Sequence, residues 1–140
     1  MNVYSTPQFL QRIELLQHHN AYADVLADIC QFLSEKDIHE LHQMVDVLKR
    51  TPGIYSLNKH RIPNRTMNKG KSGSYRCISV CLPQLNAIYL GYIYPKTGPE
   101  GVANLDKEDY QKIARQVQEA IASNDLYELD VYQGTFRRVK

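Results

Sequence analysis

The spacing of the apolar residues changes near Gly53, and this change constrains the fold more than any other feature of the chain. Before Gly53, apolar residues recur at intervals of three and four, which is the repeat of an amphipathic helix. After it come short runs of β-branched and aromatic residues bounded by turn residues, a pattern typical of strands. A mixed α+β chain is therefore expected.

The first third of the chain is expected to be largely helical. A first helix is predicted over residues 7–18, where Thr6 can cap the helix and Pro7 can take its first position. A second follows over 22–33. A third is marked by apolar residues from Ile38 to Leu48, and Thr51-Pro52-Gly53 is expected to end it.

The middle of the chain is expected to form strands. Residues 54–63 are predicted to be extended, and 64–73 form a polar, glycine-containing loop. Residues 75–82 and 87–94 predict a hairpin with its turn at 83–86.

The last part of the chain predicts one more helix and a short strand. After a loop at 95–104, Asp106 can cap a helix whose apolar stripe runs from Tyr110 to Ile121. Residues 126–131 alternate between apolar and polar and predict a strand.

These segments predict one α+β domain over residues 1–140. In it, an extended N-terminal helical part packs on a small, mainly antiparallel twisted sheet, and a tail occupies roughly residues 124–140. A chain of 140 residues is long enough to bury most of its apolar surface without disulfides or metal.

Composition limits the class of protein. The three cysteines, Cys30, Cys77 and Cys81, are an odd number without paired ligand spacing, which predicts buried free thiols instead of a disulfide framework or a zinc site. The mean hydropathy of -0.47 predicts no membrane span. The first residues lack the pattern of a signal peptide, so a cytoplasmic protein is expected.

The charges are segregated along the chain, although the net charge is only +2. The stretch from Lys49 to Pro99 contains no acidic residue. Its basic residues are Lys49, Arg50, Lys59, Arg61, Arg65, Lys69, Lys71, Arg76 and Lys96. A locally basic stretch allows a nearly neutral protein to hold a phosphate backbone. A solvated basic surface without a ligand is the alternative.

The basic residues of this stretch are expected to meet on the sheet. Lys59 and Arg61 are two residues apart and share a strand face, and Arg76 begins the next strand. A second set, Tyr92, Tyr94 and Lys96, also shares one face. Because single-stranded RNA stacks its bases on aromatic rings and places its phosphates against cations, the combination favours RNA binding.

Two runs of sequence resemble a known family. The run GKSGSYRCISV at 70–80 is followed by IYLGYIYPK at 88–96. Together they resemble the G-K-S-G-x-x-R-V-I-Y and I-Y-L-L-x-x-Y-x-K patterns of HigB-type toxins in the RelE superfamily, and the resemblance covers about residues 55–120.

The resemblance implies a RelE-like fold and a ribosome-dependent messenger RNA endoribonuclease. Cleavage would proceed by attack of the ribose 2′-hydroxyl on the neighbouring phosphate, with no metal or cofactor. The implied partners are the ribosome, messenger RNA and a cognate antitoxin protein that blocks the activity, with a toxin–antitoxin hetero-oligomer as the expected assembly and no membrane involved.

The same resemblance assigns site residues. Arg76 would hold the scissile phosphate. Lys59 and Arg61 would stabilise charge or transfer a proton, with the lysine favoured because arginine is a poor base. The other implied catalytic residues are Lys71, Tyr94 and Lys96. The implied RNA-binding residues are Arg65, Lys69 and Tyr92.

The sequence leaves two other functions open. ParE-like toxins of the same superfold bind DNA gyrase and would need no catalytic constellation, and a catalytically inactive RNA-binding relative is a further alternative. His60 faces the opposite side of its strand from Lys59 and Arg61, so a structural role is favoured over a catalytic one. His39 and His42 are expected on a helix surface and not at a metal.

Overall fold

A computed structural model describes residues 1–66 and 74–140. The elements in chain order are β1 (Asn2–Ser5), α1 (Pro7–Gln17), a 3₁₀ turn (Asn20–Tyr22), α2 (Val25–Ser34), α3 (Ile38–His42), β2 (Val47–Thr51), β3 (Tyr55–Ile62), β4 (Tyr75–Leu82), a 3₁₀ turn (Pro83–Leu85), β5 (Ala87–Pro95), α4 (Lys107–Ala122), β6 (Tyr127–Asp130) and β7 (Thr135–Arg138). None of the helices in the described part is long and apolar enough to cross a membrane.

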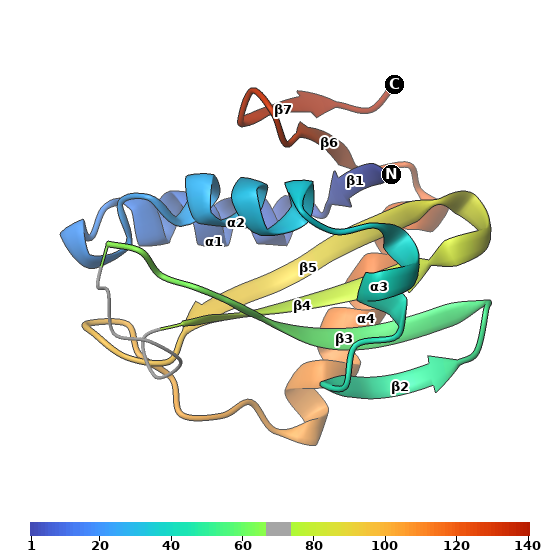
Figure 1. Cartoon of the computed structure of the whole chain (residues 1–140), viewed down its shortest axis with the longest axis horizontal. Helices are drawn as coiled ribbons and strands as arrows, with labels where there is room; N and C mark the ends of the chain where they lie inside the picture. The colour runs from blue at the N-terminus through green and yellow to red at the C-terminus, as the bar shows by residue number, and fades with distance from the viewer. Residues whose placement is uncertain (67–73) are drawn as a thin grey trace.

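The strands form one sheet in the order β2-β3-β4-β5-β1-β6-β7 (Figure 1). Among the described residues, β1 runs parallel to β5, and the other neighbouring strands are antiparallel. The predicted α+β class and the mainly antiparallel sheet are thereby confirmed.

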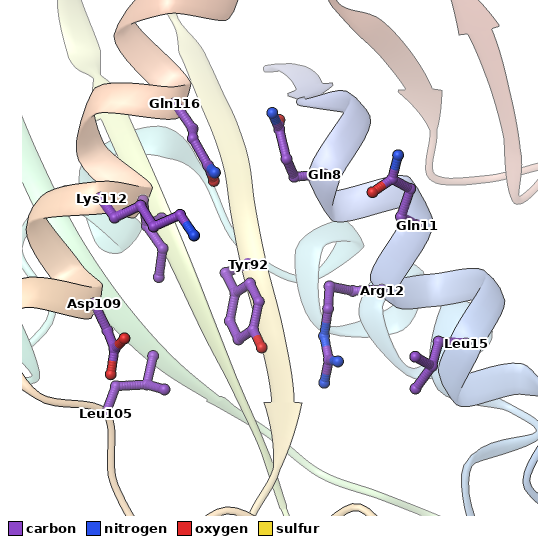
Figure 2. Close-up of a pocket in the computed structure, with 10 residues that line it drawn as sticks. Gln8, Gln11, Arg12, Leu15, Tyr92, Leu105, Asp109, Lys112 and Gln116 are labelled. Carbon is purple, nitrogen blue, oxygen red and sulfur yellow. The ribbon is translucent and has the colours of Figure 1, made fainter.

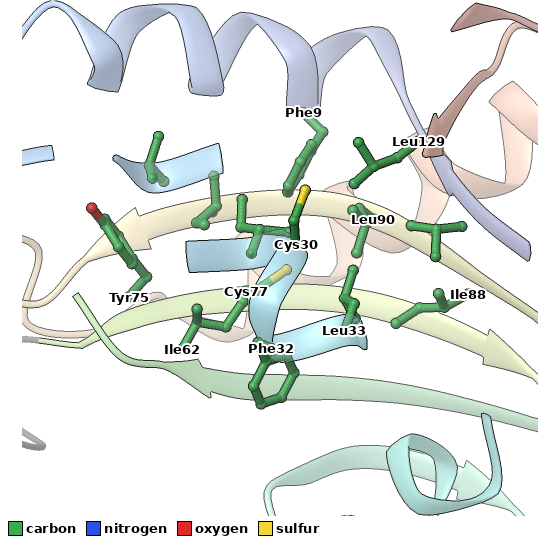
Figure 3. Close-up of a cluster of buried hydrophobic side chains, with 14 of the residues drawn as sticks. Phe9, Cys30, Phe32, Leu33, Ile62, Tyr75, Cys77, Ile88, Leu90 and Leu129 are labelled. Carbon is green, nitrogen blue, oxygen red and sulfur yellow. The ribbon is translucent and has the colours of Figure 1, made fainter. Parts of the chain in front are cut away.

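Each face of the sheet carries its own apolar cluster. On one face, Phe9 of α1 and Leu33 of α2 pack with Cys77, Ile88 and Leu90 of β4 and β5 (Figure 3). On the other face, α4 contributes a second cluster, formed with residues of β3, β4 and β5. Figure 1 accordingly shows α3 in front of the central strands and α4 behind them. The centre of the sheet is thus covered on both sides.

Several local predictions hold in the structure. The Thr6 hydroxyl accepts a hydrogen bond from the Phe9 amide, 3.2 Å away, and Pro7 opens α1. Asp106 and Asp109 form a reciprocal capping box at the start of α4. The hairpin of β4 and β5 lies where its sequence pattern places it. The three cysteines are free and buried, as predicted.

The third predicted helix is wrong beyond its first turns. The helix α3 ends at His42, and residues 47–51 form the edge strand β2. The Arg50 guanidinium donates to the carbonyls of His42 and Met44, at 2.9 and 2.7 Å, and so satisfies acceptors left by the helix end. Gly53, at a φ of +75°, belongs to the turn between β2 and β3 and not to a helix end.

The C-terminal tail is a hairpin, of which only the first strand was predicted. The Asp130 carboxylate accepts hydrogen bonds from the amides of Tyr132 and Gln133, at 3.0 and 3.1 Å. Gly134 then takes a φ of +67°, and β7 returns antiparallel to β6.

A β-bulge interrupts the hairpin of β4 and β5. Ile78 pairs with Tyr92 and Ser79 pairs with Leu90, so Gly91 is an extra residue on β5. A side chain at this position has no room, because a Cβ on Gly91 would lie 2.9 Å from Ile113 Cγ2 and 3.0 Å from Val117 Cγ2. The glycine therefore allows α4 to approach the sheet closely.

Buried polar side chains join β3 and β4 on the face that carries α3. The His60 ring lies 2.6 Å from the Ser79 hydroxyl. The His42 ring lies 2.8 Å from the Ser56 hydroxyl and accepts a hydrogen bond from the Gly53 amide. His42 is therefore buried and not on a helix surface as expected, whereas His39 is exposed.

We expect acid to destabilise the protein through His60. Burial lowers its pKa from 6.5 to about 4. Between these two values the unfolded chain binds a proton that the folded chain does not, so the free energy of unfolding falls as the pH drops through this window. His60 alone should contribute about 2 kcal/mol to the stability lost between pH 7 and pH 4.5 in urea unfolding, and His60→Gln should remove this contribution. The buried His42, whose pKa is also lowered, adds a separate loss that remains in the variant.

The exposed His39 provides the matched control for this experiment. We expect His39→Gln to lose as much stability between the two pH values as the wild type does. An unchanged loss in His60→Gln would contradict the assignment to His60.

We expect Gly91→Ala to destabilise the protein by about 1–3 kcal/mol, because the added methyl group overpacks the contact with α4. Ile113→Ala removes the atom nearest to that methyl group. In a double-mutant cycle followed by thermal unfolding, Gly91→Ala should therefore cost less in the Ile113→Ala background. Additive effects would show that the clash with Ile113 is not the cause.

Candidate functional site

The pairing of β3, β4 and β5 places the predicted basic and aromatic residues on one face of the sheet. Arg61 pairs with Arg76, and Arg76 pairs with Tyr94. Two residues after Arg76 on β4, Ile78 pairs with Lys59 on one side and with Tyr92 on the other. Ile78 belongs to the apolar cluster of α4. Directly paired residues on neighbouring antiparallel strands have Cβ atoms about 4.5–5.5 Å apart. These five basic and aromatic residues therefore lie together at the beginning of β4, on the face that carries α4.

Arg76 is the most buried cation of this group, with 7% of its surface exposed. Its guanidinium donates to the Tyr75 carbonyl at 3.3 Å. Among the described residues, no carboxylate lies within ion-pair distance of it. Burial and then the nearby charge of Arg61 lower its pKa. A buried cation without an acidic partner is unfavourable unless an anion binds to it.

Lys96 completes the cationic cluster, which we define as Lys59, Arg61, Arg76 and Lys96. Its ammonium group donates to the Ala103 carbonyl. Burial, followed by the charges of Arg76, Lys59 and Arg61, lowers the pKa of Lys96. The fold thus brings cations of β3 and β4, and the residue that follows β5, close enough for their charges to repel one another.

Two tyrosines border the cationic cluster on β5. Tyr94 is fully buried, and burial together with the neighbouring phenol of Tyr110 raises its pKa, so its hydroxyl stays protonated. The ring centroids of Tyr92 and Tyr94 are 6.3 Å apart. Tyr110, which comes from α4, was missed in the sequence because its apolar spacing indicated only a core residue.

Tyr92 lies in a cleft of about 360 Å³ between α1 and α4 (Figure 2). The Arg12 guanidinium carbon lies 4.8 Å from the Tyr92 ring centroid, and its Nε donates to the Ile93 carbonyl at 3.1 Å. Lys112 and Asp109 of α4 line the opposite side. Arg12 adds a cation from outside the basic stretch, and no local pattern in the sequence pointed to it.

Arg65 does not join the cationic cluster. Its amide donates to the Asp28 carboxylate at 3.4 Å, and its guanidinium contacts Asp28 and Gln31 on α2. Lys69 and Lys71, together with the glycines around them, lie outside the described residues.

One acidic residue reaches the cationic cluster although the basic stretch contains none. Asp46 precedes that stretch, and its carboxylate lies 3.0 Å from Arg61 Nε. Both side chains are substantially exposed, so the pair contributes little to stability. Asp46 offsets one of the four charges of the cluster.

The histidine between Lys59 and Arg61 faces away from the cationic cluster. His60 is 1% exposed and points into the layer beneath α3, where it contacts Ser79 and Met44. The described site therefore presents lysine, arginine and tyrosine side chains together with the carboxylate of Asp46, and no histidine.

These groups fit the chemistry of a phosphate. Arginine forms paired hydrogen bonds with phosphate oxygens, and lysine adds a compact charge. Cations held in place before reaction stabilise charge that develops in a transition state. Within the described part of the chain, His, Cys, Asp and Glu side chains form no cluster of three or more able to hold a metal ion.

Comparison of the chain with protein-family models, curated proteins and solved structures finds no match.

Proposed function

We propose that the protein is a ribosome-dependent messenger RNA endoribonuclease of the RelE/HigB type. The ribose 2′-hydroxyl attacks the neighbouring phosphate and breaks its bond to the 5′-oxygen, which leaves a cyclic phosphate and a free 5′-hydroxyl. One observation carries the proposal: Arg76 is buried without an acidic partner among the described residues, and three further cations surround it. A phosphodiester supplies the negative charge that this arrangement lacks.

The residues divide the proposed reaction between them. Arg76 and Arg61 hold the scissile phosphate and stabilise the charge that develops on its oxygens. We assign the proton transfer to Lys96 and not to Lys59, which the resemblance favoured, because the lowered pKa of Lys96 makes its ammonium group a better acid. Lys96 gives this proton to the leaving 5′-oxygen, and the proton of the 2′-hydroxyl passes to water. Lys59 adds positive charge. Tyr94 remains protonated and, because it is fully buried, supports Arg76 from the neighbouring strand instead of contacting the RNA.

The proposed fold and partners follow from the same resemblance. Helices on both faces of a mainly antiparallel sheet agree with a RelE-like domain. The proposed partners are the ribosome, messenger RNA and a cognate antitoxin in a hetero-oligomer, and the proposed location is the cytoplasm.

We expect induced expression of the protein in bacterial cells to arrest growth and to produce new cuts in messenger RNA. Arg76→Ala should abolish both, because it removes the buried phosphate-binding cation. Primer extension on cellular messenger RNA measures the cuts. Arg137→Ala, at an exposed position on β7, serves as the control and should cut like the wild type.

The other outcomes identify competing functions. Growth arrest without cuts in messenger RNA would contradict the nuclease and favour a toxin that inhibits DNA gyrase. Absence of arrest, with RNA binding retained in the purified protein, would indicate an inactive RNA-binding relative.

Lys96→Arg separates proton transfer from charge. The substitution keeps the positive charge but replaces the amine with a group that stays protonated. If Lys96 transfers a proton, the single-turnover rate of cleavage on programmed ribosomes should fall about 10²-fold or more. Lys59→Arg, for which only charge is proposed, should cut at close to the wild-type rate. Equal losses in both variants would contradict the division of roles.

A further inference from the structure

A groove of about 670 Å³ lies beside the cationic cluster, between the β2–β3 hairpin and α4. Tyr55 and Leu57 of β3 line its sheet side, and Tyr110 of α4 lines its helix side. Its volume is within the range of about 300–1,000 Å³ that is usual for ligand sites. The site described above does not include this groove.

The groove has a cationic rim. Lys49 of β2 and Lys107 and Arg115 of α4 line it, all three are exposed, and none of its described lining residues is acidic. Among the described carboxylates, none forms an ion pair with these three cations. An occupant of this groove is therefore expected to carry negative charge along its length.

The groove is continuous with the cationic cluster. Leu57 in its floor is two residues before Lys59, on the same face of β3. Tyr110 borders both regions, because it lines the groove and also lies beside Tyr94. Leu57 and Tyr110 thus place the groove next to the cationic cluster, within reach of an extended polyanion that has one phosphate at the cluster.

We propose that this groove binds the single-stranded RNA that flanks the scissile phosphate, with Tyr55 and Tyr110 contacting bases and Lys49, Lys107 and Arg115 contacting phosphates. The proposal rests on the proposed function for the identity of the polyanion. Aromatic rings interleaved with cations favour a nucleic acid over an acidic peptide, because every base offers a face for stacking.

Binding of an uncleavable RNA tests the groove apart from catalysis. The probe is a fluorescent 2′-O-methyl oligouridylate, which lacks the attacking hydroxyl, and its affinity for the full-length chain is measured by anisotropy over a range of salt concentrations. Lys49→Ala combined with Arg115→Ala should weaken binding about tenfold. It should also reduce the slope of log K against log salt by about 1.4, because each lost contact with a single strand contributes about 0.7.

A matched control removes the same charge elsewhere. Arg137→Ala combined with Lys140→Ala changes the net charge equally but lies on β7 and the chain end. We expect it to bind within twofold of the wild type. Equal losses in the two double variants would overturn the proposal, because binding would then follow net charge alone.

Tyr55→Leu tests stacking. Leucine keeps an apolar group in the groove but removes the ring. Relative to the wild type, we expect Tyr55→Leu to lose about tenfold in RNA affinity with an unchanged salt slope. A 4-thiouridine probe should crosslink to peptides that contain Tyr55 or Tyr110. Crosslinks confined to β5, with full affinity in Tyr55→Leu, would overturn the groove as an RNA site.

Two further results separate this inference from the proposed function. If the groove variants bind RNA normally but lose binding to poly-glutamate, the groove receives an acidic protein segment and the RNA proposal fails. If RNA binding depends on the groove while cells show no cut messenger RNA, the groove proposal stands and the nuclease proposal fails.

Discussion

The burial of β4 on both faces is the constraint on which the rest of the structure depends. All residues from Tyr75 to Cys81 are buried, because α1, α2 and α3 cover one face of the strand and α4 covers the other. A polar side chain on such a strand needs a partner inside the layer or a place near the strand end. Ser79 has a partner in His60. Arg76 is near the beginning of the strand, where it pairs with Arg61 of β3 and Tyr94 of β5.

The two faces of the sheet consequently differ in composition: one carries most of the core and the other carries the cationic cluster. The face beneath α1, α2 and α3 carries the larger apolar cluster and the buried histidines, whose ring nitrogens bond to serine hydroxyls, the Gly53 amide and the Met44 sulfur. The α4 face carries a smaller cluster and, at its end, the cationic cluster. Mutual repulsion of these cations costs stability. Because the larger apolar cluster is on the opposite face, the protein retains a supporting core while it holds an unfavourable charge arrangement in place.

Local patterns in the sequence predicted those parts of the fold that depend on neighbouring residues. The helix caps, the β4–β5 hairpin and the shared face of Lys59 and Arg61 are of this kind. The helix predicted for the segment after α3 was wrong. Val45 and Leu48 have the spacing of a helix, but Val45 is 95% exposed and the segment pairs with β3 as a strand. Arg12, Asp46 and Tyr110 reach the site through packing between distant segments, and no spacing rule within one element indicates such a contact.

The bulge at Gly91 decides which side chains of β5 reach the cationic cluster. Tyr89 lies on the α4 face, in contact with Tyr4, and in a regular strand Tyr94 would point to the opposite face. The extra residue shifts the alternation by one, so Tyr92 and Tyr94 also turn toward the α4 face. The same glycine leaves room for Ile113 and Val117 of α4. One residue without a side chain thus permits both the close packing of α4 and the meeting of aromatic and cationic groups beside it.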